Sequence, residues 1–595
     1  MLGIGCVFFG NAIAVMAPIV VRDAINDLLR EVTDTKLYKY SGLVLAITLV
    51  EGIFLFLQRR ILVGMSRDIE YEMRNDFFAH LLRLEPGFYH ENRTGDLMSR
   101  ATNDLNAVRM MVGPAVMYLT HTVAVFIFAI PVMLQVNVAL TLMAISTTPL
   151  VSYATRFFGA RIHERFQQVQ EYLSAMSARA QENFSGVRVV RAFAQESSEI
   201  EVFRKMNRDA AAKYLSVAKL SGMFFPTLHA LVGLALVVVL WYGGTLTARG
   251  AIDVGQFVQF NLYLSRMIWP MIALGWVVNL VQRGMASMKR IHQILDRAPE
   301  IADLDRPSQK ADLVRVSDSG SSLWAWPNVL PGDGDGSGDQ AHLWVPQGRI
   351  EFRGVTFGYR PETPVLRDID LEIEAGKTIA VVGRTGSGKT TLVNLIPRLI
   401  DPPAGRVFID GHDVREIPLA RLRRAIGFVS QEPFLFSMSI AENIGFGPGR
   451  AGMEDMERAA EQAGLLEDVR DFPAGFQTVV GERGITLSGG QKQRTAIARA
   501  ILRRPRILIL DDALSSVDTH TEEKILQHLR SVMRQSTSII ISHRISTVQE
   551  ADRIIVLEDG RIVEQGTHES LLERGGLYAE LYEKQLLEEE LAASE

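Results

Sequence analysis

The chain has 595 residues, is 47% hydrophobic and carries a formal net charge of −5 at pH 7. This length allows several domains, and the small net charge gives no support to nucleic acid as the partner. The single cysteine, Cys6, excludes an intrachain disulfide framework and any metal site built from several cysteines.

Six apolar stretches in the first half of the chain are long enough, or nearly so, to cross a bilayer. We place them at Leu2–Arg22, Ser41–Val63, Val112–Leu134, Val138–Phe158, Leu220–Leu246 and Val254–Val281. A cleavable signal peptide is a poor alternative for the first stretch, because it lacks a basic leader and a second span follows closely. The chain starts almost at the membrane, which leaves open a shortened start or a missing amphipathic helix.

Two long segments between spans, residues 64–111 and 159–219, have a helical pattern and are rich in arginine. Those in or beside the first are Arg59, Arg60, Arg67, Arg74, Arg83, Arg93, Arg100 and Arg109. Under the positive-inside rule, both segments face the cytoplasm.

Polar and ionisable residues within spans are costly in lipid and often functional. The candidates are Glu51, His121, His229 and Arg266, with Trp269, Trp276, Asn261 and Asn279 on the last span. Two alternatives stay open for them: ion pairs and cavity-lining structural roles, or direct contact with a substrate. Pro270 is expected to loosen the last helix and help it bend.

Composition changes sharply between residues 298 and 347, where Ser317–Ser322 and Gly332–Asp339 read as flexible linker. Leu323–Trp326 within it offers an apolar docking element, but a tether is the preferred interpretation. The Asp/Gly run lacks the spacing and terminal glutamate of an EF-hand calcium loop.

Residues 383–390 read Gly-Arg-Thr-Gly-Ser-Gly-Lys-Thr, between a strand-like run at Thr378–Val382 and a helical segment from Thr390 to Ile396. A glycine-rich turn in this context directs backbone N–H groups and a helix N-terminus at phosphate. Lys389 adds a point charge and Thr390 a magnesium ligand. The sequence therefore predicts a phosphate-binding loop.

Further motifs follow in order. Asp511 ends the apolar strand Arg506–Leu510, the Walker-B arrangement that holds magnesium through water. Gln431 and His543 each follow a strand-like run, and Tyr359 is placed to stack an adenine ring. Taken singly, each has a structural alternative: a polar loop residue, a strand cap or a core aromatic.

Residues 487–491 read Leu-Ser-Gly-Gly-Gln. With the motifs above, this element resembles the nucleotide-binding domain of ATP-binding-cassette (ABC) proteins from end to end. An ATPase fused after a sixth span, with long cytoplasmic helical extensions, resembles a B-family ABC exporter half-transporter. The fold class implied is an α-helical six-span transmembrane domain of ABC exporter type followed by an α/β P-loop ABC ATPase domain.

The resemblance implies an ATP hydrolase coupled to transport, with ATP and Mg²⁺ as cofactors, in the bacterial inner (cytoplasmic) membrane with its ATPase in the cytoplasm. The implied domains are a transmembrane domain at 1–297, a linker at 298–347 and an ABC nucleotide-binding domain at 348–595. The implied nucleotide-binding residues are Tyr359, Gly383, Arg384, Thr385, Gly386, Ser387, Gly388, Lys389, Thr390 and Thr391. The implied metal ligands are Thr390, Gln431 and Asp511, and the implied catalytic residues are Asp512, His543, Gln431, Ser488, Gly489, Gly490 and Gln491.

In this family ATP is sandwiched between the phosphate loop of one domain and the Leu-Ser-Gly-Gly-Gln of another, so a single copy implies a dimer. Phe88–Leu97 and Glu182–Ala194 resemble coupling helices that press on ATPase domains. Glu482–Gly484 resembles an exporter-specific segment that contacts them, and Asp518 is expected at the domain interface.

The informative departure is Asp512, where the family usually has a glutamate that polarises the attacking water. One methylene less retracts the carboxylate by roughly an ångström and a half. The substitution resembles the degenerate half of heterodimeric exporters and implies a partner chain with a Walker-B glutamate. The alternative is a homodimer in which Asp512 is a working base.

The expected function is ATP-driven export of hydrophobic or amphipathic compounds, of multidrug or lipid type, by alternating access. Membrane lipids and a hydrophobic small molecule are the expected contacts, and nucleic acid is not. Lipid flipping and peptide export are the alternatives. A soluble cassette protein is excluded by the six apolar stretches.

Overall fold

The computed structural model describes residues 1–146, 148–303, 346–360, 362–403, 405–447, 451–515 and 519–594. They divide into two compact units, which we call unit 1 (Met1–Leu82 with Arg93–Arg297) and unit 2 (Arg83–Asn92 with Ala298–Glu595). Leu323–Trp326 and Asp518 lie outside the described residues, so the expectations about them stay predictions.

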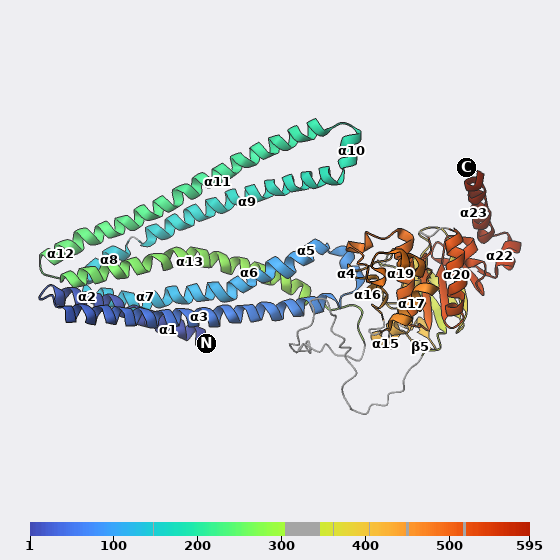
Figure 1. Cartoon of the computed structure of the whole chain (residues 1–595), viewed down its shortest axis with the longest axis horizontal. Helices are drawn as coiled ribbons and strands as arrows, with labels where there is room; N and C mark the ends of the chain where they lie inside the picture. The colour runs from blue at the N-terminus through green and yellow to red at the C-terminus, as the bar shows by residue number, and fades with distance from the viewer. Residues whose placement is uncertain are drawn as a thin grey trace, which may run out of the picture. The chain divides into compact units, whose positions relative to one another are not determined.

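Unit 1 is entirely helical (Figure 1). Its helices are α1 (Leu2–Ala14), α2 (Met16–Leu28), α3 (Asp34–Leu81), α5 (Thr94–Ser99), α6 (Leu105–Met110), α7 (Val116–Val136), α8 (Val138–Ile145), α9 (Thr148–Ser185), α10 (Val187–Ala192), α11 (Glu196–Val238), α12 (Gly244–Ala248) and α13 (Val254–Leu295). Three π-helical turns, η1 (Arg100–Asp104), η2 (Met111–Ala115) and η3 (Val239–Gly243), join consecutive helices.

Six helical stretches of unit 1 are long and apolar enough to cross a membrane, which confirms the predicted number. They are Leu2–Leu28, Asp34–Leu81, Thr94–Val136, Val138–Ser185, Glu196–Ala248 and Val254–Leu295. Each extends beyond the apolar stretch placed from the sequence. For the second to the fifth, this is because the arginine-rich segments continue the same helices. The chain is therefore a multi-pass membrane protein.

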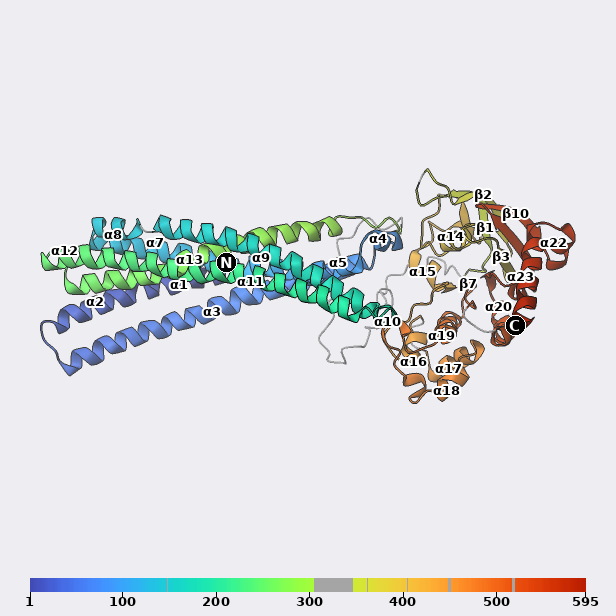
Figure 2. The same ribbon diagram turned by 90° about the horizontal axis from the view of Figure 1, so that it is seen from above.

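The core of unit 1 is formed where α7, α8, α13 and η3 meet, around Met133, Leu140, Val239 and Phe260, all of which are fully buried. The helices α9 and α11 run side by side and are joined at one end by α10 (Figures 1 and 2).

Unit 2 contains two sheets. Its strands are β1 (Ile350–Phe357), β2 (Leu366–Ile373), β3 (Thr378–Val382), β4 (Val407–Ile409), β5 (His412–Asp413), β6 (Ile426–Val429), β7 (Ile507–Asp511), β8 (Thr537–Ile541), β9 (Arg553–Glu558) and β10 (Arg561–Gly566). The antiparallel sheet has the order β2-β1-β4-β5, and the larger sheet has the order β10-β9-β3-β8-β7-β6.

Five neighbouring strands of the larger sheet, β9, β3, β8, β7 and β6, are parallel, and the candidate site involves four of them, β3, β8, β7 and β6. Every residue of β7 and β8 is buried, as expected for strands covered on both faces. Because parallel strands end at the same edge, the loops after these four strands meet at one place. This edge positions the candidate site.

The helices of unit 2 cover the sheets and form a separate helical part around α17, α18 and α19 (Figure 2). They are α4 (Pro86–Glu91), α14 (Lys389–Leu395), α15 (Leu419–Arg424), α16 (Ile440–Ile444), α17 (Met453–Gln462), α18 (Leu466–Asp471), α19 (Gly489–Leu502), α20 (Thr519–Met533), α21 (Ile545–Val548), α22 (His568–Arg574) and α23 (Leu577–Ser594), with 3₁₀ turns η4 (Gly475–Gln477) and η5 (Glu482–Gly484).

Both segments that resemble coupling helices contain a short helix, α4 in the first and α10 in the second. The segment around α4 belongs to unit 2, where Phe88 is 3% exposed. The Glu85 carboxylate there accepts a hydrogen bond from the backbone N–H of Glu300.

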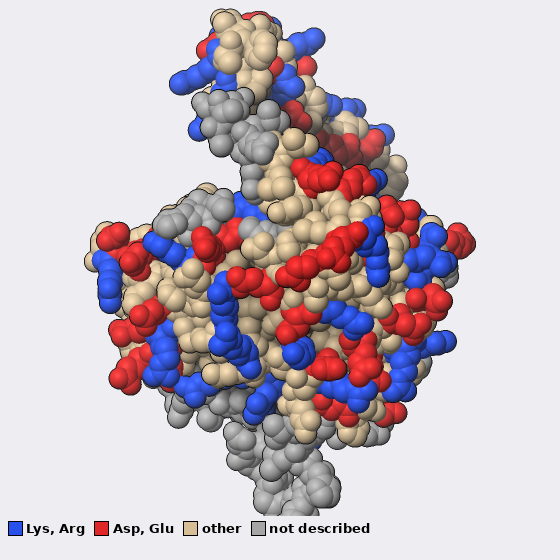
Figure 3. Space-filling view, turned by 90° about the vertical axis from the view of Figure 1, so that its right-hand side faces the viewer, with Lys and Arg blue, Asp and Glu red and all other residues tan. Residues whose placement is uncertain are grey.

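On the face of unit 2 shown in Figure 3, basic and acidic side chains are interspersed. A phosphate backbone is normally bound by clustered Lys and Arg. That face therefore does not have the charge distribution of a nucleic-acid-binding surface.

Candidate nucleotide-binding site

The phosphate loop, Gly383–Thr390, connects β3 to α14. Gly383 and Gly388 have φ values of 151° and 102°, a region that side chains strongly disfavour. A Cβ at Gly383 would lie 2.1 Å from the carbonyl oxygen of Leu557, so only glycine allows this close approach. The local backbone therefore requires the glycines that predicted the loop.

Lys389 is the residue by which the loop acts on phosphate. Its Nζ donates to the carbonyl oxygens of Gly383 (2.8 Å) and Arg384 (3.0 Å), so the side chain curls over the loop. Burial lowers the pKa of Lys389, while the carboxylates of Asp512 and Asp511 act in the opposite direction. A buried ammonium with nearby carboxylates is suited to take up an anionic group.

Ser387 provides a test of whether phosphate fits. Its side chain is 5% exposed, and among the described residues its Oγ has no hydrogen-bond partner. A buried hydroxyl left unpaired is unfavourable, so a ligand oxygen in the loop would satisfy it. The residues present fit a nucleotide phosphate.

The two acidic residues follow one another at the end of β7. Asp511 is 2% exposed and accepts a hydrogen bond from the Thr390 hydroxyl at 3.3 Å. Asp512 has a φ of 48°, and its N–H donates to the carbonyl oxygen of Ile541. Oxygen ligands of this kind suit Mg²⁺. Thr390, Asp511 and Gln431 are the residues that would hold it beside the phosphates.

A cavity of about 300 Å³ collects most of the predicted residues. It is lined by Val365, Thr385, Gly386, Gly388, Lys389, Thr390, Thr391, Gln431, Asp511, Asp512, Ile541 and His543. The edge where β3, β8, β7 and β6 end accounts for this convergence. Sequence reasoning missed Val365 and Ile541, although Ile541 ends the strand that precedes His543.

Four of the predicted nucleotide-binding residues are not in the cavity lining: Tyr359, Gly383, Arg384 and Ser387. Gly383 and Ser387 belong to the phosphate loop itself, and the other two make contacts of their own. The Tyr359 ring is largely exposed, and its hydroxyl lies 3.3 Å from the Oγ1 of Thr391. Arg384 instead pairs with Glu580 of α23 at 2.9 Å. The Tyr359 ring is thus accessible beside the loop, whereas the Arg384 side chain is directed at Glu580 of the same chain.

The signature segment, Leu487–Gln491, does not line this cavity. Ser488 caps α19: its Oγ accepts from the N–H of Gln491, whose Oε1 accepts from the N–H of Ser488. Ser488 and Gly489 are exposed. One chain therefore brings together the phosphate loop and the acidic residues, but not the signature segment.

Burial raises the pKa of Asp511, with a further rise from Asp512 and an opposing effect of the Thr390 hydrogen bond. Because its folded pKa lies above the unfolded value, the ionised group destabilises the nucleotide-free fold increasingly as pH rises from the unfolded towards the folded pKa. We therefore expect Asp511→Asn to raise the melting temperature at pH 7, by roughly 2–4 °C per kcal/mol, while abolishing Mg-ATP hydrolysis.

Thermal unfolding without nucleotide checks this, with the exposed Asp471→Asn as the control. The gain should shrink as pH is lowered towards 4, a value close to the ordinary Asp pKa of about 3.9. A lower melting temperature for Asp511→Asn at pH 7 would contradict the expectation.

Of the candidates inside the spans, Arg266 and Glu51 form an ion pair at 3.2 Å. Asn11 lies 3.0 Å from His121, and Tyr118 meets Trp276 edge to face. The ion-pair alternative therefore holds for Arg266 and Glu51.

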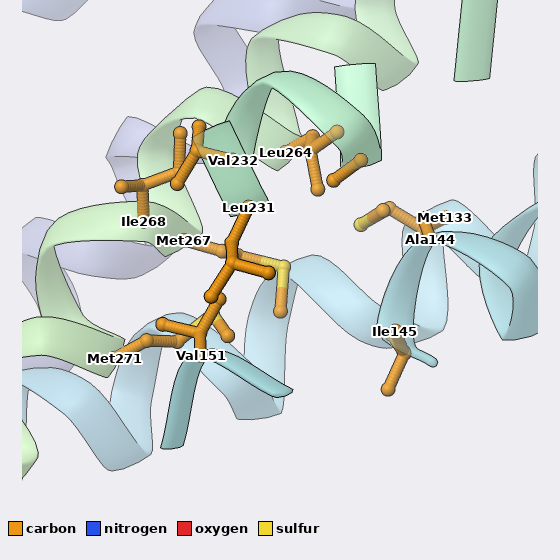
Figure 4. Close-up of a pocket in the computed structure, with 11 residues that line it drawn as sticks. Met133, Ala144, Ile145, Val151, Leu231, Val232, Leu264, Met267, Ile268 and Met271 are labelled. Atoms are coloured by element: carbon orange, nitrogen blue, oxygen red, sulfur yellow. The ribbon is translucent and has the colours of Figure 1, made fainter. Parts of the chain in front are cut away.

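A second cavity lies in unit 1 among apolar residues of α7, α8, α9, α11 and α13 (Figure 4). Met133, Met267 and Met271 are among the side chains around it. Its volume of about 30 Å³ admits about one water molecule, whereas sites for small organic ligands occupy about 300 Å³ or more. It is not a preformed site for an exported compound.

A six-span helical domain together with a P-loop nucleotide site defines the class of membrane protein with a fused transport ATPase. Comparison with known families agrees: the ABC transporter transmembrane region matches residues 1–271, and the ABC transporter domain matches residues 366–515. The chain belongs to the ABC transporter family, with the organisation of a B-family exporter half-transporter.

Several relatives match over nearly their whole length. The probable multidrug resistance ABC transporter ATP-binding/permease protein YheI of Bacillus subtilis is 37% identical, covering 97% of this chain and 93% of the relative. The multidrug resistance-like ATP-binding protein MdlA of Escherichia coli is 34% identical (96% and 90%), and the ATP-dependent lipid A-core flippase of Syntrophus aciditrophicus is 33% identical (98% and 92%).

A solved structure of a bacterial Atm1-family ABC exporter with ATP bound is similar, with a TM-score of 0.76 and 27% identity over 98% of this chain and 97% of that chain. This chain thus hydrolyses ATP to drive transport and pairs with another half-transporter or with itself.

Proposed function

We propose that this chain is one half of a dimeric exporter that uses ATP to move hydrophobic or amphipathic compounds across the cytoplasmic membrane. The main support for a dimer is that the signature segment at the start of α19 is exposed and does not line the nucleotide cavity of its own chain. A second chain would supply that helix N-terminus, whose dipole favours the γ-phosphate. The names of YheI and MdlA support the substrate class.

In the proposed site, Gly383–Thr391 surrounds the phosphates and Tyr359 stacks the adenine. Lys389 neutralises phosphate charge. When bound, magnesium neutralises charge on the β- and γ-phosphates. Gln431 and His543 face the same cavity and orient the attacking water and the γ-phosphate.

We further propose that this chain's own site hydrolyses slowly and that the partner is a different chain with a Walker-B glutamate. The shorter carboxylate of Asp512 is the support, because a general base must reach its water within hydrogen-bond distance. The intact Leu-Ser-Gly-Gly-Gln would complete the competent site on the partner. The alternative is a homodimer in which Asp512 is adequate.

The transport proposal is tested with inside-out membrane vesicles that hold the assembled transporter. We expect ATP, but not a non-hydrolysable analogue, to drive uptake of a fluorescent amphipathic dye. A control chain with Ser488→Arg, which alters the signature segment offered to the partner's nucleotide, should show none. Movement of labelled lipid between leaflets without dye uptake would favour the flippase alternative, which the Syntrophus relative's name supports.

A further inference from the structure

The first membrane span is broken in two, between α1 and α2, at Val15. Pro18, on the second half, has no N–H and cannot make the helical bond to the carbonyl of Ala14 four residues earlier. Within a bilayer no water replaces that donor, so the protein itself must satisfy the carbonyl.

Two side chains of α13 supply the donors. Arg266 Nη1 donates to the carbonyl oxygen of Ala14 at 2.9 Å, and the Tyr263 hydroxyl donates to that of Val15 at 2.6 Å. Tyr263 is fully buried. The second arm of Arg266 reaches Glu51 of α3, which balances its charge.

The two halves of the span pack against different neighbours. The inner half, α1, lies on α3 and α7, whereas α2 lies mainly on α13. The outer end of α2 is also tied to α13, because Asn26 Oδ1 accepts from the N–H of Gly255 at 3.0 Å. The break is therefore where the first span passes from one set of helices to another.

We propose that Arg266 is a positioning residue for transport: it replaces the hydrogen bond that Pro18 removes and so holds the first span, at its interruption, against α13. The expected effect on transport rests on the proposed export function, whereas the contact between Arg266 and the Ala14 carbonyl does not. It assigns Arg266 to the backbone of the first span and not to a transported anion.

The test is a double-mutant cycle between Arg266→Met and Pro18→Ala in the full chain in lipid nanodiscs, assembled with its partner where one is required. Pro18→Ala restores the missing N–H, so Ala14 no longer needs Arg266. We expect Arg266→Met alone to reduce the dye exported per ATP hydrolysed by on the order of tenfold, and by much less in the Pro18→Ala background. Arg266→Lys, which keeps a charged donor, should retain most of the coupling.

Tyr263→Phe is the matched control. The Val15 carbonyl keeps a regular helical donor in the N–H of Ile19, so its cost should be the same in both backgrounds. Arg266→Met also removes the ion-pair partner of Glu51. This happens whether residue 18 is proline or alanine, so its cost cancels in the cycle.

Melting temperatures of the same variants, followed by tryptophan fluorescence, separate failure of the inference from failure of the proposed function. If no variant exports dye, the cycle in melting temperature still tests the pair. The inference is also supported if the single variant Arg266→Met fails to assemble but the double variant Arg266→Met with Pro18→Ala assembles. Additive effects, or equal failure in both backgrounds, overturn it.

Discussion

Asp512→Glu raises the ATP turnover of this chain, purified alone in lipid nanodiscs, by on the order of a hundredfold. Asp512 lies in the nucleotide cavity beside Asp511 and Lys389. The added methylene advances the carboxylate by roughly an ångström and a half, towards the distance a general base needs. Steady-state phosphate release, wild type beside variant, measures it.

The backbone conformation at Asp512 decides which control variant this experiment needs. Its φ of 48° lies in the left-handed region, which Asp tolerates better than longer side chains. Asp512→Gln has the length of glutamate without its basicity, so it should share any loss of stability but not the gain in turnover. Robust wild-type turnover would show that Asp512 is a working base and would end the heterodimer proposal.

Lys389→Ala lowers ATP affinity by about tenfold to a hundredfold and leaves no measurable hydrolysis. Charge-assisted hydrogen bonds to phosphate are worth about 1.5–3 kcal/mol, and 1.4 kcal/mol is tenfold in affinity. Binding of a fluorescent ATP analogue and phosphate release provide the two readouts.

The fold should survive this substitution. Burial lowers the pKa of Lys389, which means that the folded, nucleotide-free domain disfavours its charged form. Lys377→Ala is the matched control, because that lysine is half exposed and pairs with Asp552. If both lysine variants bind ATP equally well, Lys389 does not contact phosphate.

The nucleotide site was largely predictable because its main residues lie at the end of an apolar strand or in the loop that follows one. Lys389, Gln431, Asp511 and His543 lie far apart in the chain, yet parallel strands end at one edge and bring them together. The six spans were predictable for a similar reason, since bilayer thickness sets their length. Resemblance supplied the roles, which position alone does not give.

The breaks within spans were not predicted. The stretch Val138–Phe158 was expected to be continuous, but α8 ends at Ile145 and α9 begins at Thr148. Pro149 cannot donate to the carbonyl of Ile145, as Pro18 cannot donate to that of Ala14. However, α13 continues through Pro270. Whether a proline breaks a span depends on packing around it, which a linear pattern does not contain.

The separation of the signature segment from the phosphate loop has a genetic consequence. If two chains build each site together, a substitution at Ser488 disables the site on the partner and leaves this chain's own loop intact. Such an allele would act dominantly over a normal partner. In the homodimer alternative, a second allele altered at Lys389 would complement it, because both defects then fall in one composite site and the other site stays intact.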